Sequence, residues 1–80
     1  MSRVLLLDAD KPFDVFEVVE LTDGLARVRS AFLFEVGEEL RVRLEVNGKV
    51  SEAQARVLAH TGPSDDKVTE LELVERTESR

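Results

Sequence analysis

The dipeptide Asn47-Gly48 is the feature that most constrains how this chain can fold. Both residues adopt positive φ at little cost, so the pair is a strong signal for a two-residue β-hairpin turn. Leu40 to Val46 alternates apolar and charged residues before the turn, and 52–59 alternates after it. A period of two is typical of a half-buried strand. The segment therefore predicts a long antiparallel hairpin with one apolar face.

The position of the turn also fixes the register of this hairpin. It places the apolar residues of the two strands opposite one another and creates two pairs of opposite charges across the strands. A slip by one residue would lose the common apolar face and both charge pairs. The predicted partners are Val46 and Lys49, Leu44 and Ser51, Val42 and Ala53, Leu40 and Ala55, Arg43 and Glu52, and Glu39 and Arg56.

Four further segments have the composition of strands, rich in Val, Leu or Phe and bounded by turn residues. An amphipathic helix is the alternative for 13–21, but the β-branched valines there disfavour it. With the hairpin, these segments predict an all-β fold, a small six-stranded antiparallel barrel. The four segments are 4–7, 13–21, 25–30 and 67–75, with an apolar connection at 31–37.

The length of 80 residues predicts a single domain. We expect it to occupy residues 1–75 and to be followed by a disordered tail at 76–80, which has no apolar residue. The absence of cysteine excludes disulfides, thiolate ligands and cysteine nucleophiles. The apolar run at 4–7 is too short for a signal peptide or a membrane span. We therefore expect a cytoplasmic protein without membrane insertion.

Charge and aromatic content restrict the ligands of this chain. Its 17 acidic and 11 basic residues give a formal net charge of −6. Such a chain is repelled by phosphate backbones, so a nucleic-acid polymer is not expected as a partner. Tyr and Trp are absent, which leaves few rings on which bases could stack.

Residues that could carry out catalysis or bind a metal are sparse. His60 is the only histidine and has no neighbour at ligand spacing, so we interpret it as a solvent-exposed residue at a strand end. The acidic pairs Asp8/Asp10 and Asp65/Asp66 fall in turns, where carboxylates bind local backbone amides. No serine has a G-x-S-x-G context, and glycine-rich phosphate loops are missing. The sequence predicts no catalytic residue, no metal and no cofactor, and thus a binding protein.

The order of strands and turns across residues 13–75 has a distinctive pattern. Its parts are the turn Glu20-Leu21-Thr22-Asp23-Gly24-Leu25, the short strand Ala26-Arg27-Val28, the turn Val36-Gly37, and the hairpin strands Leu40 to Val46 and Ala53 to Val57. This pattern resembles PilZ domains, in which a [D/N]-x-S-x-x-G turn precedes a short strand, an apolar connection and a hairpin. The resemblance implies a six-stranded antiparallel barrel that commonly binds the bacterial messenger cyclic di-GMP.

The family's two ligand motifs are altered in this chain. The R-x-x-x-R stretch is reduced to Arg3, with Leu7 at the position of the second arginine. In the turn motif, Glu20 replaces Asp or Asn, Thr22 keeps the hydroxyl of Ser, and Leu25 stands in place of the last Gly. Charge-assisted contacts to arginine contribute about 1.5–3 kcal/mol each. We therefore expect ordinary cyclic di-GMP binding to be lost.

The leading hypothesis is a protein–protein interaction module that acts in a bacterial signalling or motility system. Its candidate contact surface is Phe32, Leu33 and Phe34, although these residues could instead cap the open end of the barrel. Another hypothesis is a structural domain that forms homo-oligomers through an exposed strand edge.

A different hypothesis is a receptor for cyclic di-GMP, or for another cyclic dinucleotide, with divergent ligand residues. Four arginines at outward positions could form a basic strip, or could belong to a solvated face that they share with glutamates. The candidate ligand residues are Arg3, Glu20, Thr22, Arg27 and Arg29, and the strip would consist of Arg27, Arg29, Arg41 and Arg43.

Overall fold

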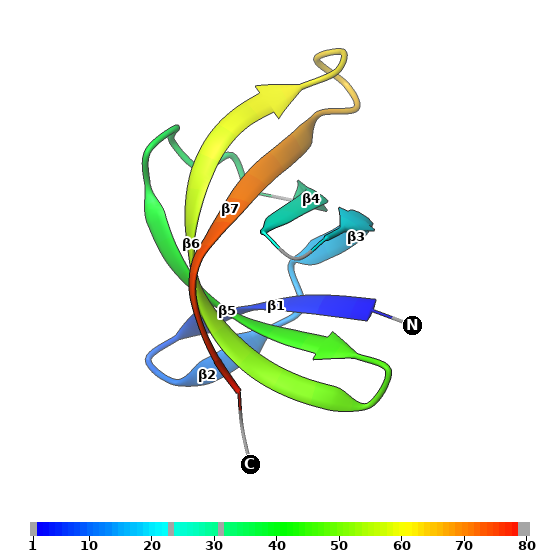
Figure 1. Cartoon of the computed structure of the whole chain (residues 1–80). Helices are drawn as coiled ribbons and strands as arrows, with labels where there is room; N and C mark the ends of the chain where they lie inside the picture. Colours follow the sequence, from blue (N-terminus) through cyan, green and yellow to red (C-terminus); the bar gives the residue numbers. More distant parts are fainter. Residues whose placement is uncertain (1, 23, 31, 79–80) are drawn as a thin grey trace.

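The computed structural model describes residues 2–22, 24–30 and 32–78. The described residues form strands joined by turns and loops, with no helix among them, which confirms the all-β prediction (Figure 1). The strands are β1 (Ser2–Asp8), β2 (Lys11–Phe13), β3 (Phe16–Leu21), β4 (Leu25–Ser30), β5 (Glu39–Val46), β6 (Lys49–Thr61) and β7 (Val68–Glu78).

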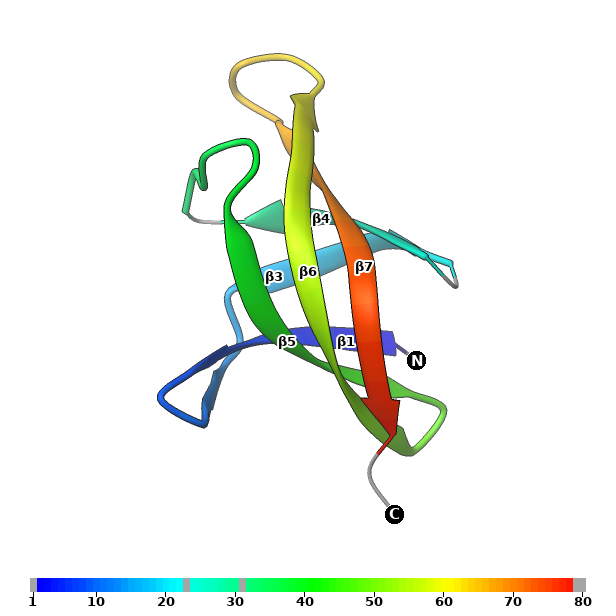
Figure 2. The same ribbon diagram turned by 60° about the vertical axis from the view of Figure 1, so that its left-hand side comes forward.

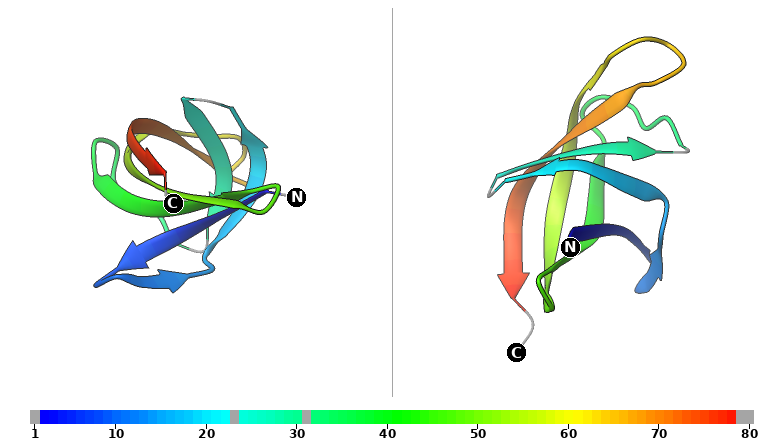
Figure 3. Two further views of the ribbon diagram at one scale, coloured as in Figure 1. Left: turned by 60° about the horizontal axis from the view of Figure 1, so that its bottom comes forward. Right: turned by 90° about the vertical axis from the view of Figure 1, so that its right-hand side faces the viewer.

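All seven strands belong to one antiparallel sheet in the order β2-β1-β5-β6-β7-β4-β3. The sheet coils until β3 lies beside β1 (Figure 2), and the strands wrap around a common axis (Figure 3). Among the described residues, however, no ladder joins β1 to β3. The fold is thus the small antiparallel β fold that the sequence predicted, with seven strands instead of six and with the sheet left open where the barrel would close.

The additional strand arises where the sequence predicted only a turn. Ala9 and Asp10 both have positive φ, 51° and 64°, and they fold Lys11–Phe13 back against β1. The chain then bends at Asp14 and Val15, and β3 begins at Phe16. The single strand predicted over 13–21 is thus divided, with Phe13 in β2, 14–15 between the strands and 16–21 in β3.

The β5–β6 hairpin has the predicted register, and all six predicted residue pairs are present among its partners. Asn47 and Gly48 have φ of 51° and 82°, as a turn of this kind requires. The charge contacts differ from the prediction, because Glu52 is bonded to Arg41 at 2.8 Å instead of to Arg43. Long side chains can reach diagonal neighbours, so a correct register leaves the choice of partner open.

The core lies inside the coiled sheet and is built from small aliphatic side chains and one buried ring, Phe16. Every strand except β2 contributes buried side chains to the core, and those of β6 are Ala53, Ala55 and Val57. The largest fully buried side chains are Val4, Val28, Val42, Leu44, Val57 and Leu71.

Strand β7 extends beyond the predicted boundary at residue 75. Its backbone continues to Glu78, which is paired with Ser51 of β6. The long β6 offers pairing partners along this whole stretch, so an apolar residue is not needed to keep the chain extended. Of the tail predicted at 76–80, residues 76–78 therefore belong to β7, and 79–80 lie outside the described residues.

Candidate functional site

The loop between β4 and β5 carries the most exposed apolar side chains of its neighbourhood. Phe32, Leu33 and Val36 are 55%, 73% and 63% exposed. We call these three side chains the apolar loop surface. Phe32 and Leu33 were predicted as contact residues, whereas Val36 was assigned to the apolar connection and its closing turn. The sequence sign that could have identified Val36 is an apolar residue directly before a glycine. Gly37 has a φ of 92° and turns the chain there.

Backbone hydrogen bonds attach this loop to β6. The Gly37 amide donates to the Val57 carbonyl at 2.7 Å, and the Val57 amide donates to the Glu38 carbonyl at 2.9 Å. Within the loop, the Glu35 amide donates to the Glu38 carboxylate at 3.1 Å. The backbone that carries the apolar loop surface is therefore held by hydrogen bonds. This lowers the conformational entropy that the loop would lose when a partner binds.

His60 provides a second attachment of the same loop. Its Nε2 lies 2.6 Å from the Phe34 carbonyl oxygen, and its Nδ1 lies 2.9 Å from the hydroxyl of Thr69. A carbonyl can only accept, so Nε2 carries a proton and donates it. The interpretation of His60 as a solvent-exposed residue is thus wrong, because the ring is half-buried and bridges β6, β7 and the loop. These partners are distant in sequence, so no local pattern indicated them.

Phe34 has a different role from its two neighbours. Its half-buried ring packs against the core and lies 5.9 Å, centroid to centroid, from the ring of Phe16. The ring of Phe32 lies 6.3 Å from it on the exposed side. The two alternatives for this stretch therefore apply to different residues: Phe34 caps the core, and Phe32 and Leu33 remain exposed. Ala31 lies outside the described residues.

The predicted arginine strip is interleaved with acids. Each of three arginines has two carboxylate partners, so the strip is a face of mixed charge. The nitrogen–oxygen distances are 3.8 Å and 3.5 Å from Arg27 to Glu20 and Glu70, 3.5 Å and 2.8 Å from Arg29 to Glu17 and Asp66, and 3.9 Å and 2.8 Å from Arg41 to Asp10 and Glu52.

Arg29 and Arg41 form the two shortest of these contacts, both at 2.8 Å. The hydrogen bond from the Nε of Arg29 to Asp66, followed by the negative charge of Asp66, raises the pKa of Arg29 above its ordinary value, and Glu17 contributes further. Arg43 has no ion pair among the described residues, and its Nε is buried without a partner. The register places Arg43 opposite Leu5, which is only 5% exposed, and long arginine stems commonly cover such apolar neighbours.

The five candidate ligand residues do not form one site. Glu20 and Arg27 are paired across β3 and β4, with Arg29 two residues further along. Thr22 closes a turn, since its amide and its hydroxyl both donate to the Leu25 carbonyl at 2.9 Å and 3.2 Å. Arg3 belongs to β1, and its ion pairs, at 3.4 Å and 3.3 Å, are formed with carboxylates of Asp14 and Glu45. Asp23 of the turn motif lies outside the described residues.

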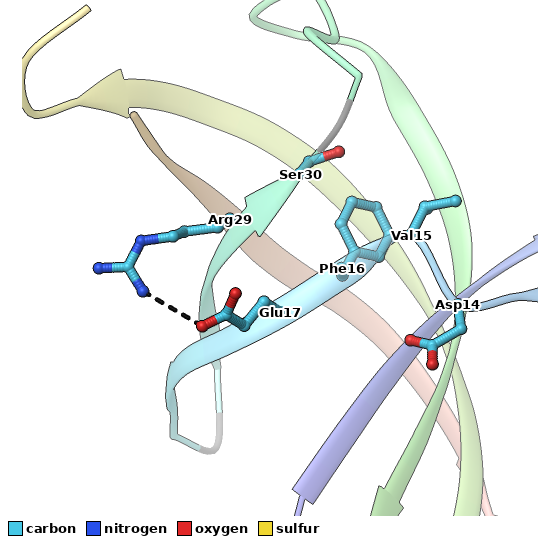
Figure 4. A pocket seen from close by; sticks show the side chains of 6 residues that line it. All are labelled: Asp14, Val15, Phe16, Glu17, Arg29 and Ser30. Atoms are coloured by element: carbon cyan, nitrogen blue, oxygen red, sulfur yellow. Dashed lines mark hydrogen bonds and ion pairs between the residues drawn. The ribbon is translucent and has the colours of Figure 1, made fainter. Parts of the chain in front are cut away.

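An open depression of about 360 Å³ lies beside the start of β3 (Figure 4). Arg29 is the only cation among its lining residues, and it is paired with Glu17 across the depression. The carboxylate of Asp14 adds further negative charge, so the electrostatics there disfavour an anionic ligand. The lining residues are Asp14, Val15, Phe16, Glu17, Arg29 and Ser30.

In the described parts of the chain, no three His, Cys, Asp or Glu side chains are grouped so that they could hold a metal ion. Nor is any helix there long and apolar enough to cross a membrane. No family model matches the chain, and no similar curated protein or solved structure was found. The PilZ resemblance therefore rests on the pattern of strands and turns alone.

Proposed function

We propose that this chain is a non-catalytic binding domain that contacts another protein through the apolar loop surface. The observation that carries the proposal is the exposure of Phe32, Leu33 and Val36 in one short loop. Single exposed apolar residues are normal on soluble proteins, but a group of them commonly marks an interaction site. The hydrogen bonds of Gly37 and His60 fix the loop backbone, which favours binding by a preformed surface.

The biological setting that we propose follows from the resemblance to PilZ domains. It is a cytoplasmic regulatory module in a bacterial signalling or motility system, acting without cyclic di-GMP. The ion pairs of Arg27 and Arg29 support this choice, because a phosphate would have to compete with carboxylates already in place. Arg3 is likewise engaged with Asp14 and Glu45.

A role in homo-oligomerisation through a strand edge has less support. The free edge of β3 carries Glu17 and Glu20. Antiparallel pairing of two copies of β3 about its centre would bring these glutamates toward one another, and like charges across strands destabilise a sheet. The other end of the sheet is the short β2, which contains Pro12. Short edges with proline resist the addition of a strand.

The test compares two substitutions of exposed apolar residues by glutamate. Leu33→Glu alters the apolar loop surface, and Val74→Glu places the same charge on β7, where Val74 is 52% exposed. We expect both variants to keep the wild-type circular dichroism spectrum and melting temperature. Only Leu33→Glu should lose the protein captured from a cytoplasmic extract. If Leu33→Glu remained folded and still captured the same protein, the proposed contact surface would be wrong.

A further inference from the structure

The charges near the apolar loop surface indicate the kind of partner that fits it. Glu35 and Glu38 belong to the same loop and are exposed. Glu39 follows at the start of β5, and its carboxylate is bonded to Gln54 rather than to a cation. The exposed apolar side chains are therefore bordered by acidic groups.

The turn between β6 and β7 adds acidic charge at the same end of the molecule (Figures 1 and 2). Asp65 is exposed and has no ion pair among those of the described residues, whereas Asp66 is engaged by Arg29. His60 joins this end to the loop through the Phe34 carbonyl. Lys67 is the one cation of this turn against Asp65 and Asp66, so the turn itself carries a net negative charge.

We propose that the occupant is a short cationic segment of another protein, with apolar anchor residues flanked by Lys or Arg. This inference rests on the proposed function and specifies its partner. Opposite charges around an apolar centre steer association and reject wrong partners. The small number of exposed side chains favours a linear segment, because obligate dimers bury about 2,000 Å² or more.

A second copy of the chain fits this surface poorly. Two acidic borders would face each other across a symmetric interface, and like-charge contacts there are costly. The net charge of −6 adds long-range repulsion between two copies.

The experiment is a selection of displayed random peptides on the immobilised full chain. We expect the recovered peptides to combine Leu, Phe or Trp with an excess of Lys and Arg over the input library. Their binding should be lost on Leu33→Glu. A fluorescent copy of a recovered peptide is then titrated against Glu35→Lys and against Asp8→Lys, a matched control at the far β1–β2 turn (Figure 1).

Glu35→Lys should weaken this peptide about threefold at low salt, and the difference should vanish near ~1 M salt, where the screening length is about 3 Å. Asp8→Lys should change the affinity far less. Peptides that need Leu33 but show no excess of Lys and Arg would overturn this inference and leave the proposed function standing. Peptides that bind Leu33→Glu as well as wild type, or a failure to recover any, would count against both. A dimer in light scattering that Leu33→Glu dissociates would replace the cationic segment by a second copy.

Discussion

Replacing His60 by leucine tests the most specific contact that fixes the apolar loop surface. The change removes the bonds to the Phe34 carbonyl and to the hydroxyl of Thr69, a residue only 3% exposed. A buried polar group left without a partner costs about 1–3 kcal/mol. Two such groups in a half-buried site give about 2–4 kcal/mol. For a domain of this size each kcal/mol lowers the melting temperature by about 4–8 °C, so we expect a fall of about 8–32 °C.

Thermal and urea unfolding followed by circular dichroism measure this effect. A double-mutant cycle with Thr69→Val isolates the hydrogen bond, because the double variant no longer buries an unpaired hydroxyl there. We expect the two changes together to cost about 1 kcal/mol less than the sum of their separate costs. Amide exchange at Gly37 should also accelerate in His60→Leu, since its bond to the Val57 carbonyl would be less protected. A melting temperature within about 2 °C of wild type would refute the reasoning.

Three further results are expected. Ala9→Asn should raise the unfolding free energy by about 0.5–1 kcal/mol in urea titrations, because Ala9 has φ of 51° and asparagine tolerates this conformation better; an unchanged midpoint would argue against strain there. Gly62→Ala should cost about 2 kcal/mol or more, and more than Gly48→Ala, because a Cβ at Gly62 would lie 2.8 Å from the Asp66 carbonyl oxygen, whereas none lies within 4 Å at Gly48; equal melting temperatures would contradict this. Calorimetric titration with cyclic di-GMP should show no binding heat, since the arginines are paired with acids; saturable heat lost in Arg29→Ala would reverse that expectation.

The parts of the fold that the sequence predicted are those set by local chemistry. The register of β5 and β6 was correct because Asn47-Gly48 fixes the turn and the alternation fixes the face. The turn at Ala9 and Asp10 was missed as a hairpin, because alanine gives no sign of the positive φ that it adopts. The open sheet was also missed, since closure depends on coiling and on the approach of strands distant in sequence.

The sequence identified two of the exposed apolar residues of the candidate site but not the contacts that hold its loop. Phe32 and Leu33 were identified from apolar residues in a connection, yet nothing local distinguished them from Phe34, which turns inward onto Phe16. His60 has the opposite history, because an isolated histidine gave no indication of partners in two distant segments. The arginines were identified as outward, but their pairing depends on which strands are neighbours.

The absence of a ladder between β1 and β3 has a consequence for how the described part of the chain opens. β3 is bonded through its ladder to β4 alone. The backbone of β4 is bonded to the remaining sheet through Leu25–Val28 against β7, and the Leu73 amide donates to the Gly24 carbonyl. The ion pairs of Arg27 with Glu70 and of Arg29 with Asp66 add side-chain contacts. We therefore expect the β3–β4 hairpin to open as one unit at a lower free energy than the β5–β6–β7 sheet, which has longer ladders. Such a partial opening would uncover Phe16 and the core side of Phe34 while the bonds from the loop to β6 remain, so the apolar area next to the loop would grow without global unfolding.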